Sequence, residues 1–527
     1  MDSQDAGKRG GDRMKTSVCV IGAGIGGLMA GAYLAQAGYA VTILEKAATV
    51  GGSAGWYVRR NRRFPTGATL AFGLEAGGLL RSRLEELGVE LEAEELEHPM
   101  DIVLPDRKVA VLRNAAAWEE ELAQRFPEQR AATLRFWREL EAISHAVLGV
   151  TGTGAALPVR RPADLGGLPG YLLRHPRTAL QLARSARRTV LDLLRAHGLE
   201  HYEPLVRLLN LQLVDAVQTD VSRAALLPSS LALTVYRQGS FGLDGGLGGL
   251  CEALASRIAG WGGEIVTASP VQSAVYNAKQ RKWSVEAARR SGFYDIVVNN
   301  TGLDLEGGLA AGANPRAGTK AEPGRALPVE LQPQPHAGAW GAFRLDAVLD
   351  ETGFEACLPR LALPFAYQIA PDCQHDRLFG DEHGPVYVTF QRTLDGKGRP
   401  VIGEVTMTAT VHTDTWRWLA CSDEAYAAQK QQAGEALWRE IAKIADLRRH
   451  VRSADIGTPR TYLRYIGKAE VGGFPLTVER ALLRPAGVRT SVPGLYHAGE
   501  TVFPGPGTLS AALSGMYAAR AIGRDYR

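Results

Sequence analysis

The chain has 527 residues, a length that predicts two domains or one large interleaved unit. Hydrophobic residues make up 45% and charged residues 22%, with a formal net charge of only +4, so composition favours a globular protein and argues against nucleic acid as a partner. The five cysteines form no Cys-x-x-Cys pair and have no histidine at ligand spacing, which favours a reducing, cytoplasmic setting without a structural metal.

The chain begins with a polar, charged stretch over residues 1–15, where we expect a disordered lead rather than a signal peptide, with Met14 as an alternative start. The next stretch, Thr16–Leu44, carries no charge and is long enough to resemble a transmembrane helix. Its glycines instead divide it into a strand over 18–21, a helix over 26–37 and a strand over 40–44. We therefore predict a βαβ unit.

Glycines at the turn of this unit fit the pattern G-x-G-x-x-G. They are Gly22, Gly24 and Gly27. Such glycines allow a tight turn, the close approach of a pyrophosphate and the packing of helix on strand, and the helix N-terminus favours phosphate. Glu45 ends the second strand, where an acid accepts a hydrogen bond from a ribose hydroxyl. The pair Gly51 and Gly52 follows at once, as in flavoproteins of the glutathione-reductase type, and indicates FAD rather than NAD.

Helical patterns follow over 79–91 and 128–148, and a third covers 168–199. In the third, arginines at helical spacing define one face: Arg177, Arg184, Arg188 and Arg195. Apolar residues lie opposite: Ala179, Ala183, Ala186, Val190 and Leu193. Two interpretations stay open, a solvated basic face on a helix packed against the core, or an interfacial helix on an anionic membrane.

Later segments indicate a return to the nucleotide-binding domain. We expect a helix over 247–260 and strands over 264–266, 271–275 and 296–298. A Pro- and Gly-rich loop over 307–338 precedes β-rich segments over 387–391 and 404–413 and a helix over 422–445.

With both ends in view, the chain resembles the phytoene desaturase family of FAD-dependent carotenoid desaturases and isomerases, which is related to the flavin amine oxidases. The resemblance rests on "VIGAGIGGL" near the start, "GGLGGLCEALASRI" in the middle and "LYHAGETVFPGPGTLSAALSGMYAARAI" at the end. The segment "TGATLAFGLEAGG" looks closest to the carotenoid 3,4-desaturase branch.

The resemblance implies an FAD site built from both ends of the chain. Gly22, Gly24 and Gly27 would hold the pyrophosphate, Glu45 the adenosine ribose, and Val271 the adenine through its backbone. Gly499 and Glu500 would meet the pyrophosphate and ribityl chain, and Gly507, Thr508 and Leu509 would open a helix facing the flavin's pyrimidine edge. The remaining expected cofactor contacts are Gly51, Gly52, Ala54, Thr66 and Gly67. Pro65 and Thr66 stand where many relatives carry an acid, and "GTLSAALSG" lacks a proline that several relatives have, so those two features are not carried over.

The resemblance also implies an α/β fold: a discontinuous Rossmann-like FAD-binding domain with an inserted α+β substrate-binding domain and a helical, membrane-facing part. The FAD-binding parts would cover 16–78, 236–306 and 471–527, and the substrate-binding parts 79–235 and 307–470.

The implied activity is desaturation of a long acyclic carotenoid, with hydride transfer to the flavin and loss of a proton, by a peripheral enzyme on the cytoplasmic face of the membrane. Alternatives are a redox-neutral carotene isomerase or polyene saturase, a flavin amine oxidase, and a non-catalytic lipid-binding escort protein. No metal site, nucleophile motif or oligomeric state is indicated. Candidate catalytic residues are His497, beside the flavin motif, and Arg460 and Arg464, which either point toward the substrate or form ion pairs.

Overall fold

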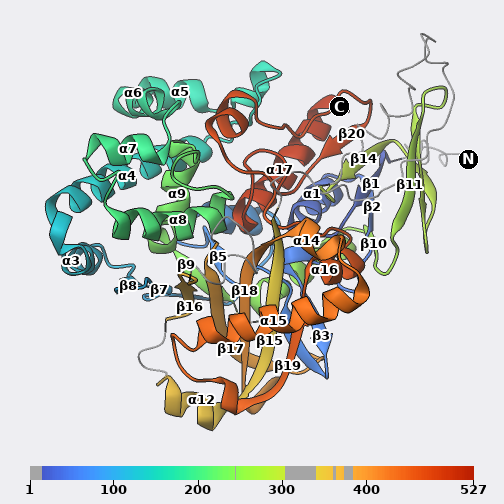
Figure 1. Ribbon diagram of the computed structural model, residues 1–527. Coiled ribbons are helices and arrows are strands. Elements are labelled where there is room, and N and C mark those ends of the chain that lie inside the picture. Colours follow the sequence, from blue (N-terminus) through green and yellow to red (C-terminus); the bar gives the residue numbers. More distant parts are fainter. Residues whose placement is uncertain (1–14, 244, 303–339, 360–363, 373–383, 527) are drawn as a thin grey trace, which may run out of the picture.

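The computed structural model describes residues 15–243, 245–302, 340–359, 364–372 and 384–526 (Figure 1). Apart from Lys15, the lead expected over residues 1–15 lies outside the described residues. The loop expected over 307–338 and the boundary expected at 306/307 also lie outside them. Within the described ranges, no helix combines the length and the hydropathy needed to cross a membrane.

A five-stranded parallel sheet forms the centre of the nucleotide-binding half, with the strand order β10-β2-β1-β14-β20. Its strands are β1 (Ser17–Ile21), β2 (Ala40–Leu44), β10 (Glu264–Val266), β14 (Ile296–Asn299) and β20 (Leu495–His497). Three stretches far apart in the chain therefore complete one sheet. A parallel sheet covered on both faces needs apolar strands, so apolar strands recur wherever the chain returns to this sheet, even near its end.

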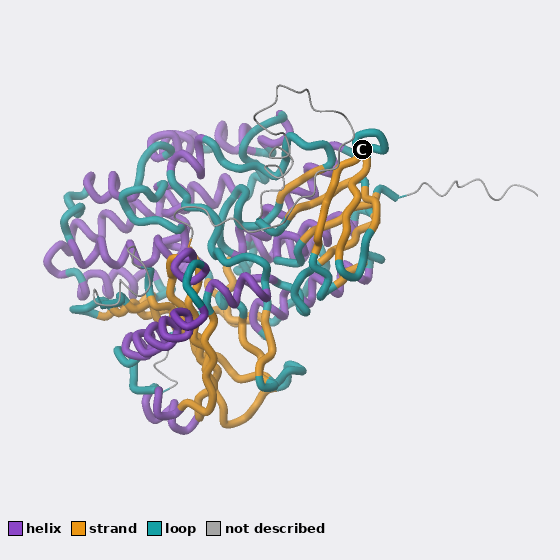
Figure 2. Tube along the Cα trace, turned by 45° about the vertical axis from the view of Figure 1, so that its right-hand side comes forward, coloured by secondary structure: helices purple, strands orange, loops and turns teal. Residues whose placement is uncertain are grey.

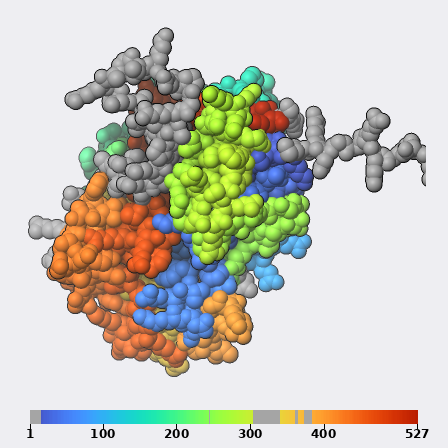
Figure 3. All heavy atoms as spheres, turned by 90° about the vertical axis from the view of Figure 1, so that its right-hand side faces the viewer, coloured from blue at the N-terminus to red at the C-terminus, as the bar shows by residue number. Residues whose placement is uncertain are grey.

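The two faces of this sheet are covered differently. The helices α1 (Ile25–Gln36), α10 (Gly246–Gly260) and α17 (Thr508–Asp525) bury the side of the sheet that includes Val20 and Val298. The opposite side packs on an antiparallel sheet whose central side chain is the fully buried Trp283. That sheet consists of β11 (Val271–Asn277), β12 (Lys282–Ala287) and β13 (Gly292–Tyr294). Figure 3 shows its outer surface in yellow-green.

A seven-stranded mixed sheet forms the base of the other half, where the sequence analysis expects the substrate to bind, in the order β19-β15-β18-β17-β16-β7-β8. Its strands are β7 (Met100–Val103), β8 (Lys108–Val111), β15 (Trp340–Asp350), β16 (Ala366–Ile369), β17 (Val386–Leu394), β18 (Pro400–Asp414) and β19 (Val451–Gly457). The alternation of side chains separates two faces. One face packs Phe343, Met407 and their neighbours under α15 (Asp423–Ile441), whereas the other turns Ala342, Thr410 and His412 toward the interior of the molecule.

A layer of helices covers this interior from the other side (Figure 2). The helices are α3 (Ala115–Arg125), α4 (Arg130–Thr151), α5 (Leu168–Arg174), α6 (Pro176–Ser185), α7 (Val190–Ala196), α8 (Glu203–Val217) and α9 (Leu226–Gln238). The remaining elements are α2 (Leu79–Glu86), α12 (Glu351–Cys357), α14 (Thr415–Leu419), α16 (Pro459–Tyr465), β3 (Trp56–Arg59), β4 (Arg62–Pro65), β5 (Ala71–Phe72), β6 (Ala93–Glu95) and β9 (Ser240–Leu243).

Two sequence-based expectations are corrected. The substrate-binding part was expected to start at residue 79, but α2 buries Leu80 and Leu84 in the core shared with α1 and α17. The continuous helix expected over 168–199 is instead three helices. The first helix ends before Pro176, which is the first residue of α6. The second ends before α7, where Thr189 caps the new helix and the Thr189 backbone N–H donates to the Asp192 carboxylate (2.9 Å).

The division into three helices removes the single basic face. Arg188 lies 3.8 Å from Glu139 and Arg195 lies 3.4 Å from Asp192, so these two arginines are held by acids, while Val190 is buried in the core of the helical layer.

Candidate functional site

A cavity of about 1010 Å³ lies between the two halves. It starts at the carboxyl ends of β1 and β2, passes the interior face of the mixed sheet, and reaches α5 and α6 in the helical layer. The carboxyl edge of a parallel sheet is the usual place for a ligand in such folds. Because both halves contribute to its wall, this cavity is the candidate functional site.

The turn between β1 and α1 forms one end of the cavity. Gly22 has a backbone φ of +96°, a conformation that residues other than glycine rarely adopt. Both Gly22 and Gly24 line the cavity. The first helical hydrogen bond runs from the Leu28 N–H to the Gly24 carbonyl (2.9 Å), so the preceding amide groups have no helical partner. Gly27 lies behind the turn, where a Cβ would overlap the carbonyl oxygen of Gly22. It therefore packs the helix on the strand and does not line the cavity.

Glu45 lies beside this turn, with a buried carboxylate that accepts two backbone hydrogen bonds. Oε2 accepts from Ala23 N–H (2.6 Å) and Oε1 from Ala47 N–H (2.7 Å). Burial raises the pKa of Glu45, while these hydrogen bonds act in the opposite direction. Glu45 and Val271 both line the cavity, so the expected ribose and adenine contacts lie at the same end.

Asn300 adds a polar group that the sequence analysis missed. Its Nδ2 donates to the Gly22 carbonyl (3.2 Å), and its Oδ1 is buried without a hydrogen-bond partner among the described residues. Asn300 lines the cavity where β14 ends, next to the glycine turn. A Cβ built on Gly26 would lie 2.7 Å from this oxygen and one built on Gly499 would lie 2.9 Å from it, so Asn300 packs the glycine turn against the C-terminal segment.

The second glycine segment lies beside the first. Gly51, Gly52, Ala54 and Gly67 line the cavity, and Gly51 has φ +110°. Thr66 is not part of the lining. Its carbonyl instead accepts hydrogen bonds from Arg344 Nη1 and from the Tyr462 hydroxyl, both at 2.9 Å. Thr66 therefore connects this segment to the mixed sheet.

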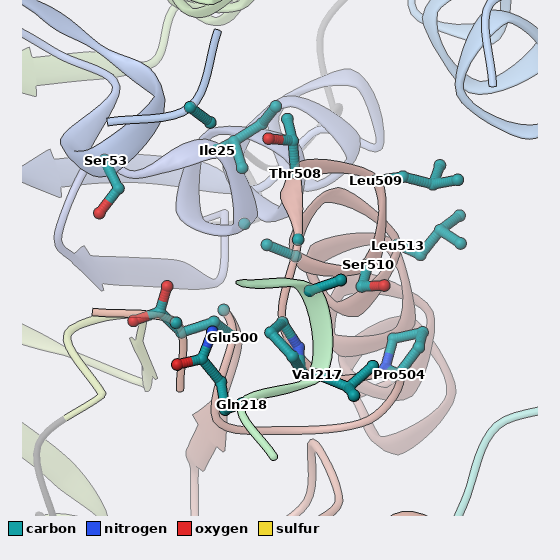
Figure 4. Close-up of a pocket in the computed structure, with 18 of the residues that line it drawn as sticks. Ile25, Ser53, Val217, Gln218, Glu500, Pro504, Thr508, Leu509, Ser510 and Leu513 are labelled. Atoms are coloured by element: carbon teal, nitrogen blue, oxygen red, sulfur yellow. The ribbon is translucent and has the colours of Figure 1, made fainter. Parts of the chain in front are cut away.

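The C-terminal segment closes the same end of the cavity (Figure 4). Gly499, Glu500, Gly507, Thr508 and Leu509 all line it. The α17 helix begins at Thr508, after Gly507 with φ +95°, so its free N-terminal amides lie at the cavity, as those of α1 do. The carboxylate of Glu500 pairs with Lys468, which also lines the cavity.

The three candidate catalytic residues do not belong to the described lining of the cavity. Arg460 donates to the Trp418 carbonyl (2.7 Å) and pairs with Asp423 (2.8 Å), which favours its ion-pair interpretation. The guanidinium of Arg464 lies over the exposed ring of Tyr465. His497 contacts Asn299 at the end of β20, with Nδ1 3.2 Å from the amide nitrogen.

The sequence analysis also missed polar residues farther along the cavity wall, among them Asp215, Tyr236, Tyr387 and His412. Burial raises the pKa of Asp215 to about 6 and lowers that of His412 to about 4. A signal for Asp215 was present, because "LNLQLVDAV" places a single acid in an otherwise apolar helical segment. The strand residues gave no such signal, since alternation does not show which face of a sheet lines a cavity.

The far end of the cavity is apolar. Its wall comes from α4, α5, α6 and α9: Val147, Val150, Leu168, Leu172, Ala179, Leu182, Ala183, Leu227, Leu231 and Val235. The apolar residues of α6 that were expected on the core or membrane side thus face the cavity. This arm suits a long hydrophobic ligand.

Comparisons with known proteins agree with this architecture. Residues 20–87 match the family described as "NAD(P)-binding Rossmann-like domain". The chain is 24% identical to the prolycopene isomerase of Daucus carota, over 96% of this chain and 80% of that protein. It is 40% identical to the phytoene desaturase of Neurospora crassa over 15% of this chain and 13% of that protein. A solved putrescine oxidase shares the fold, with a TM-score of 0.58, 13% identity and coverage of 97% of this chain and 98% of that one.

The chain belongs to the carotenoid isomerase and desaturase family of flavoproteins. The expected family is confirmed, as is the Rossmann-like fold with an inserted mixed-sheet domain, which the putrescine oxidase structure shares. The place within the 3,4-desaturase branch stays a prediction. The isomerase relative matches almost the whole of this flavoprotein, whereas the desaturase match covers a short segment, so the alternative of isomerisation is better supported than desaturation.

Proposed function

We propose that this flavoprotein is an FAD-dependent isomerase of a long polyene, acting without net redox change on a cis-configured acyclic carotenoid such as prolycopene. The observation that carries the proposal is the similarity to a prolycopene isomerase along 96% of the chain. The apolar arm of the cavity supports it, because it provides an extended hydrophobic wall beside the nucleotide end. The short desaturase match favours desaturation as the second candidate.

The nucleotide end of the cavity fits FAD. Gly22 and Gly24 leave room for the pyrophosphate between the helix N-termini of α1 and α17, and Glu45 would accept a hydrogen bond from the ribose. When bound, the flavin supplies a group that exchanges electrons or stabilises charge on a conjugated chain.

The other residues of the cavity position the polyene. The leucines and valines of α4, α5 and α9 exclude water from the arm, so charge that develops on the substrate near the nucleotide end is not quenched by solvent. The mixed sheet forms the opposite wall through Thr410, His412 and Tyr387. Burial holds the pKa of His412 at about 4, so this histidine is neutral at physiological pH and adds no positive charge.

We also place the peripheral membrane contact at α5 and α6. Leu173 is 83% exposed and Leu180 is 51% exposed, while Leu172 and Ala183 of the same helices line the cavity. Four exposed arginines lie in the same stretch of chain as these leucines: Arg174, Arg177, Arg184 and Arg187. Apolar side chains with basic neighbours are typical of surfaces that bind anionic lipid. A substrate that leaves the membrane here would enter the apolar arm directly.

The test is to incubate the purified, flavin-loaded protein with prolycopene in liposomes, under oxidising and under reducing conditions, and to analyse the products by chromatography and mass spectrometry. We expect a change of retention time and spectrum at constant mass. A loss of two hydrogens would instead support desaturation, and a gain would support a saturase. Unchanged prolycopene and unchanged other cis polyenes would contradict the proposal.

The matched control is Gly24→Val, because a Cβ at this position already lies 2.9 Å from Asn300 Nδ2 and a larger side chain projects into the pyrophosphate site. We expect this variant to lack both flavin and activity.

A further inference from the structure

Asp215 is a half-buried acid on the cavity wall that has no charged partner among the residues that the structure describes. It lies in the last turn of α8, and its Oδ2 accepts one hydrogen bond, from Gln368 Nε2 of β16 (3.2 Å). Burial raises the pKa of Asp215 and the hydrogen bond from Gln368 acts in the opposite direction, while no cation among the described residues contributes. Its carboxyl group is therefore held inside the protein without charge compensation.

Two fully buried acids of this protein are paired with a cation. Asp346 pairs with Arg344 (2.8 Å), and Asp101 pairs with Lys108 (3.0 Å). Buried carboxylates that serve the fold are normally paired in this way, because an unpaired charge is costly. Asp215 departs from that rule on the surface of the cavity, which is where a group that exchanges a proton with a ligand would lie.

The groups that face Asp215 are apolar or neutral. The titratable ones are Tyr236 of α9 and Tyr387 of β17, and burial, together with the charge of Asp215, raises the pKa of both phenols. Phe72 packs edge-on against Tyr236, with ring centroids 5.2 Å apart. In these surroundings the pKa of Asp215 rises to about 6, so about half of the carboxyl groups are protonated at pH 6 and about one in ten at pH 7, far more than for an ordinary aspartate.

Asp215 also lies near the nucleotide end of the cavity. Gln218 Nε2 donates to the Asp215 carbonyl oxygen (3.0 Å), and Gln218 and Val217 face the cavity beside Pro504 and Glu500 (Figure 4). A polyene that extends from the apolar arm toward α17 would therefore pass this carboxyl group.

We propose that Asp215 is the acid–base residue that gives a proton to the polyene and takes it back during isomerisation, an inference that rests on the proposed function. The Asp215 O–H bond breaks, and the proton adds to one carbon of the conjugated chain. The π electron pair of one C=C bond forms the new C–H bond. The result is a carboxylate and a cation delocalised along the polyene, in which the former double bonds rotate. The carboxylate then removes a proton from the same carbon, which restores the double bond and the acid. No electron is gained or lost overall.

The experiment compares Asp215→Asn with the wild type, using flavin-loaded protein and prolycopene in liposomes. The asparagine keeps the shape and the hydrogen bond to Gln368 but holds no transferable proton. We expect turnover to fall by at least about 100-fold, the lower range for loss of a general acid–base group. Flavin absorbance and the amount of bound polyene, measured on the same samples, should not change.

Two further variants make the result specific. Asp220→Asn removes an acid from the same chain segment that caps a turn at Ser222, outside the described cavity lining, and should keep wild-type turnover. Asp215→Glu restores a carboxyl group and should recover part of the activity. The wild-type rate should fall as pH rises through about 6 and should be slower in D2O, and the residual rate of Asp215→Asn should show neither effect.

The outcomes separate this inference from the proposed function. If the wild type converts no polyene, the proposed function fails, and this inference fails with it. If the wild type is active and Asp215→Asn matches it, only the role of Asp215 is overturned. Loss of flavin or of polyene binding together with turnover in Asp215→Asn would also overturn it, in favour of a structural role.

Discussion

Gly515 of α17 packs directly on Gly26 of α1, so closely that a Cβ on Gly515 would overlap the Gly26 carbonyl oxygen and lie 2.9 Å from the Ala30 amide nitrogen. A Cβ on Gly26 would in turn meet the Ala511 carbonyl oxygen at 2.9 Å. The first and last helices of the nucleotide-binding half thus share one backbone contact. Because both helices begin at the cavity, this contact fixes the relative position of their two N-termini.

The first prediction concerns Gly515→Ala. The added methyl group has no room between α1 and α17, so we expect a loss of about 1–3 kcal/mol in the free energy of unfolding and a lower flavin content after purification. Gly523→Ala is the matched control in the same helix, because a Cβ there has no atom within 4 Å. It should be neutral or stabilising by up to about 1 kcal/mol. Equal stability of the two variants in urea titrations would contradict the importance of the contact.

A second prediction concerns the buried pair Arg344 and Asp346. Arg344 also donates to the Thr66 carbonyl, so the pair connects the mixed sheet to the segment that carries Gly67. Asp346→Ala leaves the arginine without its partner, and we expect a loss of about 3–5 kcal/mol in stability.

The control for this prediction is Arg81→Ala, which breaks the exposed pair with Glu85 and should cost at most about 1 kcal/mol. The free energy of unfolding from denaturant titration checks both variants. A change below 1 kcal/mol in Asp346→Ala would show that the pair does not hold this segment.

The nucleotide-binding half could be predicted from sequence because local signals agree there. The strand expected over 40–44 matches β2, and the strand expected over 264–266 matches β10. Glycine spacing placed Gly22 and Gly24 at the cavity, since a tight turn with a positive φ has a strong sequence requirement. Gly27 shows the limit of such a motif, because the same pattern contains a packing glycine that does not reach the cavity.

The substrate-binding half was less predictable because its elements depend on distant contacts. The periodicity of residues 168–199 continues across Pro176 and Thr189, yet the proline and the Thr189–Asp192 capping box divide it. Both signals were present in the sequence, and the arginine spacing was given too much weight. The cavity position of Tyr387 and His412 depends on the register of β17 and β18 and has no local signature.

A third prediction concerns the pH dependence of stability. The pKa of Asp215 is about 6 in the folded protein and 3.8 in its ordinary state, so the folded protein binds a proton between pH 4 and 6 that the unfolded chain has lost. The contribution of Asp215 to the free energy of unfolding is therefore fully present below pH 4 and is lost as pH rises through about 6. The raised pKa corresponds to about 3 kcal/mol.

Asp215→Asn removes this dependence. We expect the variant to gain stability relative to the wild type between pH 4.5 and pH 8, by up to about 3 kcal/mol at the higher value, in parallel urea titrations. A difference between the two proteins that is constant over this pH range would mean that Asp215 does not retain a proton in the fold.

The last prediction concerns the surface of α5 and α6. Leu173 and Leu180 are exposed in the same stretch of chain as four exposed arginines, and neighbouring residues of the same helices line the apolar arm. Replacing both leucines with glutamate places negative charges next to an anionic bilayer, which repels them, and removes the apolar contact. We expect at least about tenfold weaker binding to vesicles with anionic lipid, since each basic residue near such a surface contributes about 1 kcal/mol and each buried CH₂ about 0.8 kcal/mol.

Ile402→Glu, at a residue that is 94% exposed on β18, is the matched control and should bind as the wild type does. Vesicle co-sedimentation measures the binding, and turnover of polyene dissolved in detergent should remain intact in all three proteins, because these leucines are not in the described cavity lining. Equal binding of the double variant and the wild type would place the membrane contact on another surface.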